Sequence, residues 1–236
     1  MQDEVTKHTK KVFNEFKNPR HTLTEKIREI IIEIFIIVFA VTLSIWLHNW
    51  SEHKHEQKVA NEFLKGLRND LAEDIKILEN NRNTIANLDS NYTYLLRIKR
   101  NKIPDEQQSV QIHKHLIYDL TSTHLNTGRY EGFKSSGKIE TILNNNLKQK
   151  ILLYYQQTIT KITDLEDFLN SWQLKILDFE INKDEKLPIK VFVTSDKLKG
   201  LLSLGSHNFE NNIGNYNDAI KQSKDIITEI DVEIAK

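Results

Sequence analysis

The sequence predicts an all-α protein: one N-terminal transmembrane helix followed by an up-and-down bundle of long helices. Three observations predict this fold. An apolar stretch runs from Ile30 to Leu47. Three later segments repeat apolar residues at alternating spacings of three and four, which is the period of a helix that buries one side. Seven glycines and three prolines in 236 residues are few, which favours long helices over a turn-rich sheet protein.

The composition excludes several classes of function. The chain has 33 basic and 33 acidic residues, so no overall charge attracts nucleic acid. It has no cysteine, which excludes disulfides, thiolate nucleophiles and cysteine-ligated zinc.

The apolar stretch reads IIIEIFIIVFAVTLSIWL, and 13 of its 18 residues are Ile, Val, Leu or Phe. On an insertion scale these residues contribute roughly −4 to −8 kcal/mol, against about 3 kcal/mol for one central carboxylate. The alternative of a buried core helix fits less well, because the residues from Ile34 to Val41 are apolar on every face. A cleaved signal peptide is disfavoured by the long, charge-mixed region before the stretch. We therefore predict a transmembrane helix over residues 29–50.

Flanking charges predict the orientation of this helix. The twenty residues before the span carry six Lys or Arg, and the twenty after Leu47 carry three. The positive-inside rule then places a basic tail, residues 1–28, in the cytoplasm and residues 51–236 outside it.

Each of the three periodic segments predicts one helix of the bundle. We call the apolar line along each helix its seam. The three seams are Leu64, Leu67, Leu71, Asp74, Leu78, Asn81, Ile85, Leu88, Tyr92 and Leu95; Ile151, Tyr155, Thr158, Ile162, Leu165, Leu169, Trp172, Ile176 and Phe179; and Phe209, Ile213, Tyr216, Ile220, Ser223, Ile227, Ile230 and Ile234. The first helix is expected to continue from the span.

Proline and glycine predict where these helices end. The segment Asn101–Glu106, with Pro104, closes the first helix, and Lys186–Ile189, with Pro188, closes the second. Gly205 followed by Ser206 predicts a helix stop and then an N-cap for the third helix. Between the first two helices we expect one helix near Val110–Thr123 and short helical pieces around Thr141.

Two seam positions of the first helix are polar, Asp74 and Asn81. A buried polar residue at a seam often sets the register between two copies of a helix. The favoured interpretation is that both face water where the bundle frays.

Parts of the chain resemble a bacterial family of single-pass membrane proteins of unknown function. The span from Glu33 into His48-Asn49-Trp50-Ser51-Glu52 is similar to that family's opening. Phe63–Leu71 resembles its leucine-rich helix, and Phe133–Ile139 with Tyr154-Tyr155 resembles its Ser-Gly turn and tyrosine-containing helix. The resemblance covers roughly half of the chain. It implies a bacterial inner membrane and a periplasmic helical domain, and it implies no activity.

This chain departs from the family pattern at Ala40, Trp46 and His48, where Gly, Gln and Asn are typical. Alanine in place of glycine puts a close glycine-mediated helix crossing in doubt, although Ala40 and Ser44 still form a small-x-x-x-small pair.

Glu33 is the one candidate functional residue, because an ionisable group at membrane depth is costly and is often functional. It could handle a proton or an ion, contact another membrane subunit, or reach the headgroups or Arg28.

Two short motifs suggest enzymes and lack the residues that those enzymes need. Gly132–Ile139 matches a phosphate loop, yet Ile139 replaces the Ser or Thr that holds magnesium and no strand is predicted before Gly132. Ser135–Lys138 matches S-x-x-K without the accompanying S-D-N and K-T-G. We expect Gly137 to end a short helix and the serines to cap the next.

The histidines are expected to be polar surface groups. His48, Glu52 and His55 share one helical face and could ligate a metal, but interfacial polarity explains them equally. His113 and His115 are interpreted as solvated. No metal and no cofactor is predicted.

The sequence therefore favours a membrane-anchored helical interaction module with protein partners or self-association, no small-molecule substrate, and no chemistry of its own. The alternative is an ion- or proton-handling subunit of an oligomeric membrane complex that uses Glu33. A third interpretation is an enzyme with a site between Thr123 and Asn145.

Overall fold

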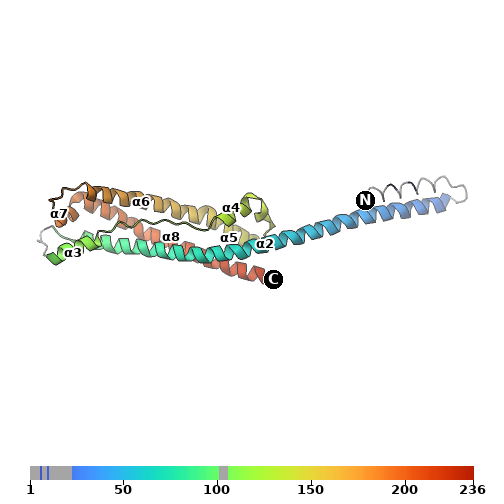
Figure 1. Cartoon of the computed structure of the whole chain (residues 1–236). Coiled ribbons are helices and arrows are strands. Elements are labelled where there is room, and N and C mark those ends of the chain that lie inside the picture. The colour runs from blue at the N-terminus through green and yellow to red at the C-terminus, as the bar shows by residue number, and fades with distance from the viewer. Residues whose placement is uncertain (1–5, 7–9, 11–22, 101–105) are drawn as a thin grey trace. The chain divides into compact units, whose positions relative to one another are not determined.

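The computed structural model describes residues 6, 10, 23–100 and 106–236. All regular structure in these residues is helical, so the predicted all-α class is confirmed (Figure 1). The chain divides into two compact units, Met1–Val59 and Ala60–Lys236.

Helix α2 (Leu23–Arg97) is 75 residues long and contains both the predicted span and the first predicted body helix. The prediction that these two helices are continuous is therefore correct. Among the described residues, this is the one helix that is long and apolar enough to cross a membrane, and only 6% of its most apolar window is buried. Large side chains of the stretch, such as Phe35 and Trp46, are 67% and 61% exposed. The stretch thus has the surface that a lipid-facing helix needs.

The second unit is a bundle in which the Ala60–Arg97 part of α2 packs with α6 (Thr160–Ile181) and α8 (Asp196–Ile234) (Figure 1). Three aromatic rings, one from each helix, meet in its core. The ring centroid of Tyr92 lies 6.1 Å from that of Trp172 and 5.5 Å from that of Phe209, and the latter two are 6.5 Å apart. Such contacts hold three helices together over one shared hydrophobic core.

The seam predicted for the first helix is the buried side of α2. Its eight apolar members are all at most 1% exposed. Asp74 is 0% exposed and Asn81 is half-buried. The interpretation that these two polar residues face water is therefore wrong, and the reason is that both bond to groups inside the same chain, as described below.

Helix α8 does not stop at Gly205, which is a second correction. The helix begins after Ser195, whose side chain accepts from the Leu198 N–H, and it continues through Gly205 and Ser206. Gly205 lies under the Trp172 ring, because a Cβ built there would be only 1.7 Å from Cη2. Glycine is thus needed for close packing rather than for a helix stop. Ser206 Oγ donates to Asp89 Oδ1 at 2.8 Å and caps nothing.

The second predicted helix is three consecutive elements, α5 (Asn145–Leu153), the π-helix η2 (Tyr154–Ile159) and α6. It ends at Ile181, before the predicted segment Lys186–Ile189. Pro188 instead precedes a short helix, α7 (Ile189–Val193), because proline is tolerated at a helix start.

The region between the first two long helices is less helical than predicted. Helix α3 (Glu106–His115) ends well before Thr123, and residues 116–127 form no helix. The short helices α4 (Gly128–Ser135) and η1 (Lys138–Thr141) agree with the pieces expected around Thr141. Pro104 and the residues beside it, 101–105, lie outside the described residues.

Candidate functional site

Glu33 is 7% exposed and is the one buried side chain among those described from Thr24 to Val59. It is not free of partners. Residues Ile30, Ile37, Val41 and Ser44 lie on the same side of α2 and are half-buried, whereas the described side chains on the other sides of the stretch are exposed. The carboxylate therefore lies on a distinct, less exposed face of the apolar stretch.

The histidine face beyond the stretch has no metal geometry. His48 Nε2 and Glu52 Oε2 are 3.9 Å apart, and both side chains are largely exposed. Within the described ranges, no group of three His, Asp or Glu side chains is placed to hold a metal ion.

His113 is exposed, as predicted, but the expectation that His115 is solvated is wrong. His115 is half-buried, its Nδ1 lies 2.6 Å from Asn91 Oδ1, and its ring stacks on Tyr94.

The phosphate-loop match lies in helices and a turn rather than in a phosphate cradle. Gly132 is inside α4, and Lys138 begins the 3-10 helix η1. Gly137 has φ of 72°, and its N–H donates to the Lys134 carbonyl, so it ends the short helix as expected. The serines do not cap the next helix. Their hydroxyls donate back to carbonyls of α4, from Ser135 to Glu131 and from Ser136 to Phe133.

The interior of the bundle contains a polar network that the sequence did not reveal. Asp74 Oδ1 accepts hydrogen bonds from the Asn126 backbone N–H at 3.0 Å and from Asn126 Nδ2 at 2.9 Å. The second oxygen, Oδ2, is buried without a partner, and so is the Tyr155 hydroxyl. Burial raises the pKa of the Asp74 carboxyl above its usual value, because a charged group loses its solvation there.

A second carboxylate, Glu166, is 4% exposed and lies at the centre of a larger set of hydrogen bonds. It accepts from the Thr123 backbone N–H at 2.8 Å, from Asn81 Nδ2 at 3.2 Å, and from the hydroxyls of Thr123 and Tyr216. Burial, followed by the hydrogen bond to Glu166 and the charge of that carboxylate, raises the pKa of the Tyr216 hydroxyl.

Both carboxylates hold the non-helical segment 116–127 against the long helices. The side chain of Asn170 adds two bonds to the same segment, accepting from the Thr121 N–H at 3.0 Å and donating to the Thr121 carbonyl at 2.6 Å. Non-helical backbone that packs in a bundle must find such partners, because an unpaired buried N–H or carbonyl is costly.

The π-helix η2 brings two neighbouring tyrosines into this interior. Tyr154 is 0% exposed and Tyr155 is 6% exposed. The Tyr154 hydroxyl pairs with Ser223 Oγ at 2.8 Å, and the Tyr155 ring stacks on Tyr130 at 4.2 Å. Burial raises the pKa of both hydroxyls. Short π-helices within α-helices are frequent at functional sites.

No family model matches this chain, and neither a curated protein nor a solved structure does. The resemblance to a bacterial single-pass family therefore stays a prediction.

Proposed function

We propose that this chain is a membrane-anchored helical interaction module, which acts through protein partners or self-association and has no chemistry of its own. One observation carries the proposal: an apolar stretch with exposed side chains lies within the same helix, α2, that forms part of the bundle. An exposed apolar surface of this length is costly in water and favourable in lipid.

The polar interior supports a structural rather than a chemical use of the buried carboxylates. Asp74 and Glu166 each accept a backbone N–H from the segment 116–127, and they hold that segment in place. Groups already used to satisfy buried backbone are poorly placed to act on a substrate.

We propose a bacterial inner membrane as the location, with residues 1–28 in the cytoplasm and residues 51–236 in the periplasm. Six Lys or Arg before the span against three after it support this orientation. The chain has no cysteine, so single cysteines report topology without background. A membrane-impermeant maleimide applied to cells with a permeable outer membrane should label Asn211→Cys and leave Lys10→Cys unlabelled. Labelling of Lys10→Cys alone would reverse the orientation.

The decisive test is cell fractionation together with the mass of the native complex. We expect the chain in the membrane fraction, released only by detergent, and in a native complex heavier than one chain. A compact monomer in the soluble fraction without detergent would overturn the anchor. A detergent-solubilised monomer that crosslinks to nothing in native membranes would overturn the interaction role.

A second function is favoured by the burial of Glu33. An ion- or proton-handling subunit would need a carboxylate shielded from lipid at this depth. Glu33→Gln should preserve localisation and the complex under the leading proposal. Loss of a proton-dependent phenotype with the complex intact would favour the second function. Glu52→Gln, an exposed carboxylate just beyond the stretch, is the matched control.

A further inference from the structure

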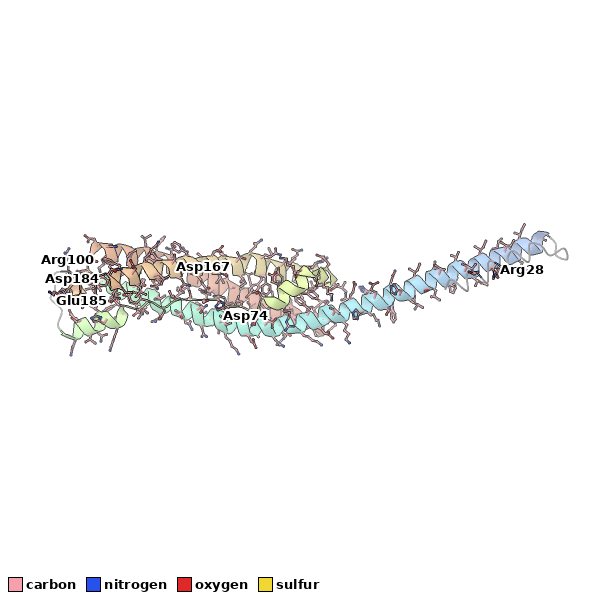
Figure 2. The ribbon with its side chains drawn as sticks, turned by 45° about the horizontal axis from the view of Figure 1, so that its top comes forward. Arg28, Asp74, Arg100, Asp167, Asp184 and Glu185 are labelled. Carbon is pink, nitrogen blue, oxygen red and sulfur yellow. The ribbon has the colours of Figure 1, made fainter. Side chains whose placement is uncertain are left out.

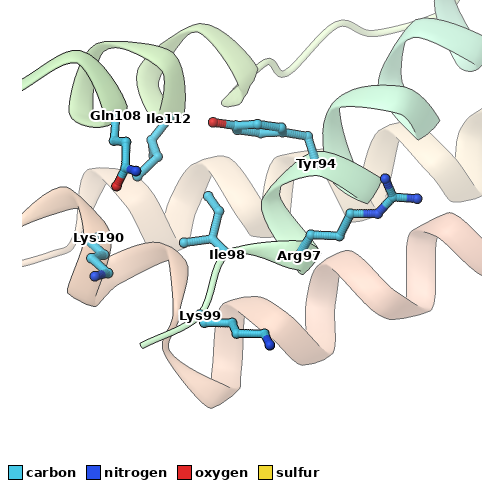
Figure 3. Close-up of a pocket in the computed structure, with 7 residues that line it drawn as sticks. All are labelled: Tyr94, Arg97, Ile98, Lys99, Gln108, Ile112 and Lys190. Atoms are coloured by element: carbon cyan, nitrogen blue, oxygen red, sulfur yellow. The ribbon is translucent and has the colours of Figure 1, made fainter. Parts of the chain in front are cut away.

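At the end of α2, a cavity of about 440 Å³ lies between three elements of the bundle (Figure 3). Helix α2 and the residues after it contribute Tyr94, Arg97, Ile98 and Lys99; helix α3 contributes Gln108 and Ile112; helix α7 contributes Lys190. All seven residues belong to the second unit, so the cavity exists independently of the anchor. Its volume is within the range of small-molecule sites.

The charged side chains described around this cavity are all basic. Arg97, Lys99 and Lys190 line it, and none of the described lining residues is acidic. Over the described part of the chain, no carboxylate lies within 4 Å of these three cations. Asp184 and Glu185 lie at the same end of the bundle (Figure 2), but neither lines the cavity. An anion that entered would therefore meet cations that no described carboxylate neutralises.

Lys190 differs from the other two cations because it is only 7% exposed. Lysine is rarely buried to this extent unless its ammonium group is paired. Arg97 and Lys99 are exposed. The site thus combines one largely buried lysine with two exposed basic side chains.

The walls of the cavity are held by contacts outside it. Lys199 Nζ donates to the carbonyl oxygens of Leu95, Leu96 and Ile98 at 2.8, 2.6 and 3.1 Å. These bonds fix the chain where it leaves α2, between Arg97 and Lys99. On the other side, the Tyr94 ring stacks on His115, with centroids 3.9 Å apart. A site that is formed before its ligand arrives binds with a smaller loss of entropy.

We propose that this cavity binds a small organic anion, in which a carboxylate or phosphate group pairs with Lys190 and an apolar body lies against Tyr94, Ile98 and Ile112. Charge-assisted hydrogen bonds from Lys and Arg are the strong ones for such groups. The apolar lining separates this ligand class from a simple inorganic ion.

The test uses the full chain in nonionic detergent micelles and isothermal titration calorimetry. The probes are phenyl phosphate, benzoate, inorganic phosphate and neutral benzyl alcohol. We expect phenyl phosphate or benzoate to bind, and to bind more weakly at higher salt, because exposed charges are screened. The tighter of the two identifies the anionic group. Equal binding of benzyl alcohol, or no binding of either anion at millimolar concentration, would overturn the proposal. Equal binding of inorganic phosphate would overturn the apolar part of it.

Lys190→Met keeps an unbranched side chain, one heavy atom shorter, and removes its charge. It should weaken binding by about tenfold to a hundredfold, the usual worth of a hydrogen bond to a charged group. Lys186→Met is the matched control, because this exposed lysine lies four residues away and does not line the cavity. If circular dichroism shows that Lys190→Met does not fold, the same binding measurement is made on Arg97→Gln, which changes an exposed side chain. Unchanged affinity in the folded variant would exclude the site.

Discussion

Two parts of helix α2 show how one helix is built for two environments. Between Ile30 and Leu47, apolar side chains point in nearly all directions and most are exposed. Between Ala60 and Arg97, they recur every three or four residues and are buried on one side, with charged residues on the other. The environment of a helix is therefore read from the distribution of apolar residues around its axis rather than from their number.

The same two parts each bury one carboxylate, Glu33 and Asp74, at 7% and 0% exposure. In the bundle, the cost of burying Asp74 is offset by two hydrogen bonds from Asn126. The comparison predicts that substitutions in the bundle change its stability, whereas those in the apolar stretch change location or membrane contacts.

The largest contrast is expected between Leu78→Ala and Leu43→Ala. Leu78 is 0% exposed in the bundle, so its truncation leaves a cavity and should cost about 2–5 kcal/mol. Leu43 is 41% exposed and should leave the free energy of unfolding of the bundle unchanged. The measurement is denaturant unfolding in detergent in a Trp46→Phe, Trp50→Phe background, where Trp172 is the one remaining tryptophan. An equal loss of unfolding free energy in both variants would mean that both parts of α2 contribute alike to the stability of the bundle.

The next contrast concerns small residues. Gly205→Ala should destabilise the bundle by about 1–3 kcal/mol, because the added methyl group overlaps the Trp172 ring. Gly214→Ala, in the same helix and with nothing within 4 Å of the new methyl group, should stabilise by up to about 1 kcal/mol. Ala40→Leu in the apolar stretch should leave unfolding of the bundle unaltered. Thermal or denaturant unfolding midpoints of the three variants test this ranking of stabilities. A Gly205→Ala protein as stable as the natural one would contradict it.

A smaller effect is expected for the pH dependence that Asp74 causes. The pKa of Asp74 is raised in the folded state. At pH values between the unfolded and the folded pKa, the folded state therefore binds more protons than the unfolded state. This contribution to stability is lost as pH rises through the folded pKa. Asp74→Asn removes the buried charge and should gain about 1 kcal/mol over the natural protein at neutral pH, with a smaller difference in acid. Unfolding curves at several pH values test this. Asp164→Asn, an exposed carboxylate, should change nothing, and a gain that grows toward acid would contradict the mechanism.

The sequence was sufficient to predict the buried side of a helix where the apolar residues recur at a regular helical spacing. The first seam is correct at every apolar position because nothing interrupts α2 between Leu64 and Leu95. The second seam is correct at Ile151, Tyr155, Ile162, Leu169, Trp172 and Ile176. It deviates at two positions, where Ile159 is buried in place of Thr158 and Glu166 in place of Leu165. The first deviation lies inside the π-helix Tyr154–Ile159, which interrupts the α-helical period. The second arises because Glu166 bonds to Thr123 and Asn81 inside the bundle.

The polar interior could not be predicted because its contacts join residues far apart in the chain. Asn126 and Asp74 are 52 residues apart, and Thr123 and Glu166 are 43 apart. The available signals were the polar seam residues Asp74 and Asn81, which indicated a buried contact and did not name its partner. The cavity lined by Lys190 is also a product of tertiary structure, since α7 was not expected to be a helix.

The smallest effect separates surface charge from core packing within the bundle. Arg129 Nε lies 2.7 Å from Asp70 Oδ2, and the arginine side chain is 47% exposed. Exposed ion pairs gain little because water already solvates both charges, so Arg129→Gln should cost about 0.2–1 kcal/mol. Raising the salt concentration should reduce this difference further, since it screens the pair. A loss as large as that of Leu78→Ala, or one that salt does not alter, would mean that Arg129 stabilises the bundle by packing over Gly66, where its guanidinium lies within 2.5 Å of a built Cβ.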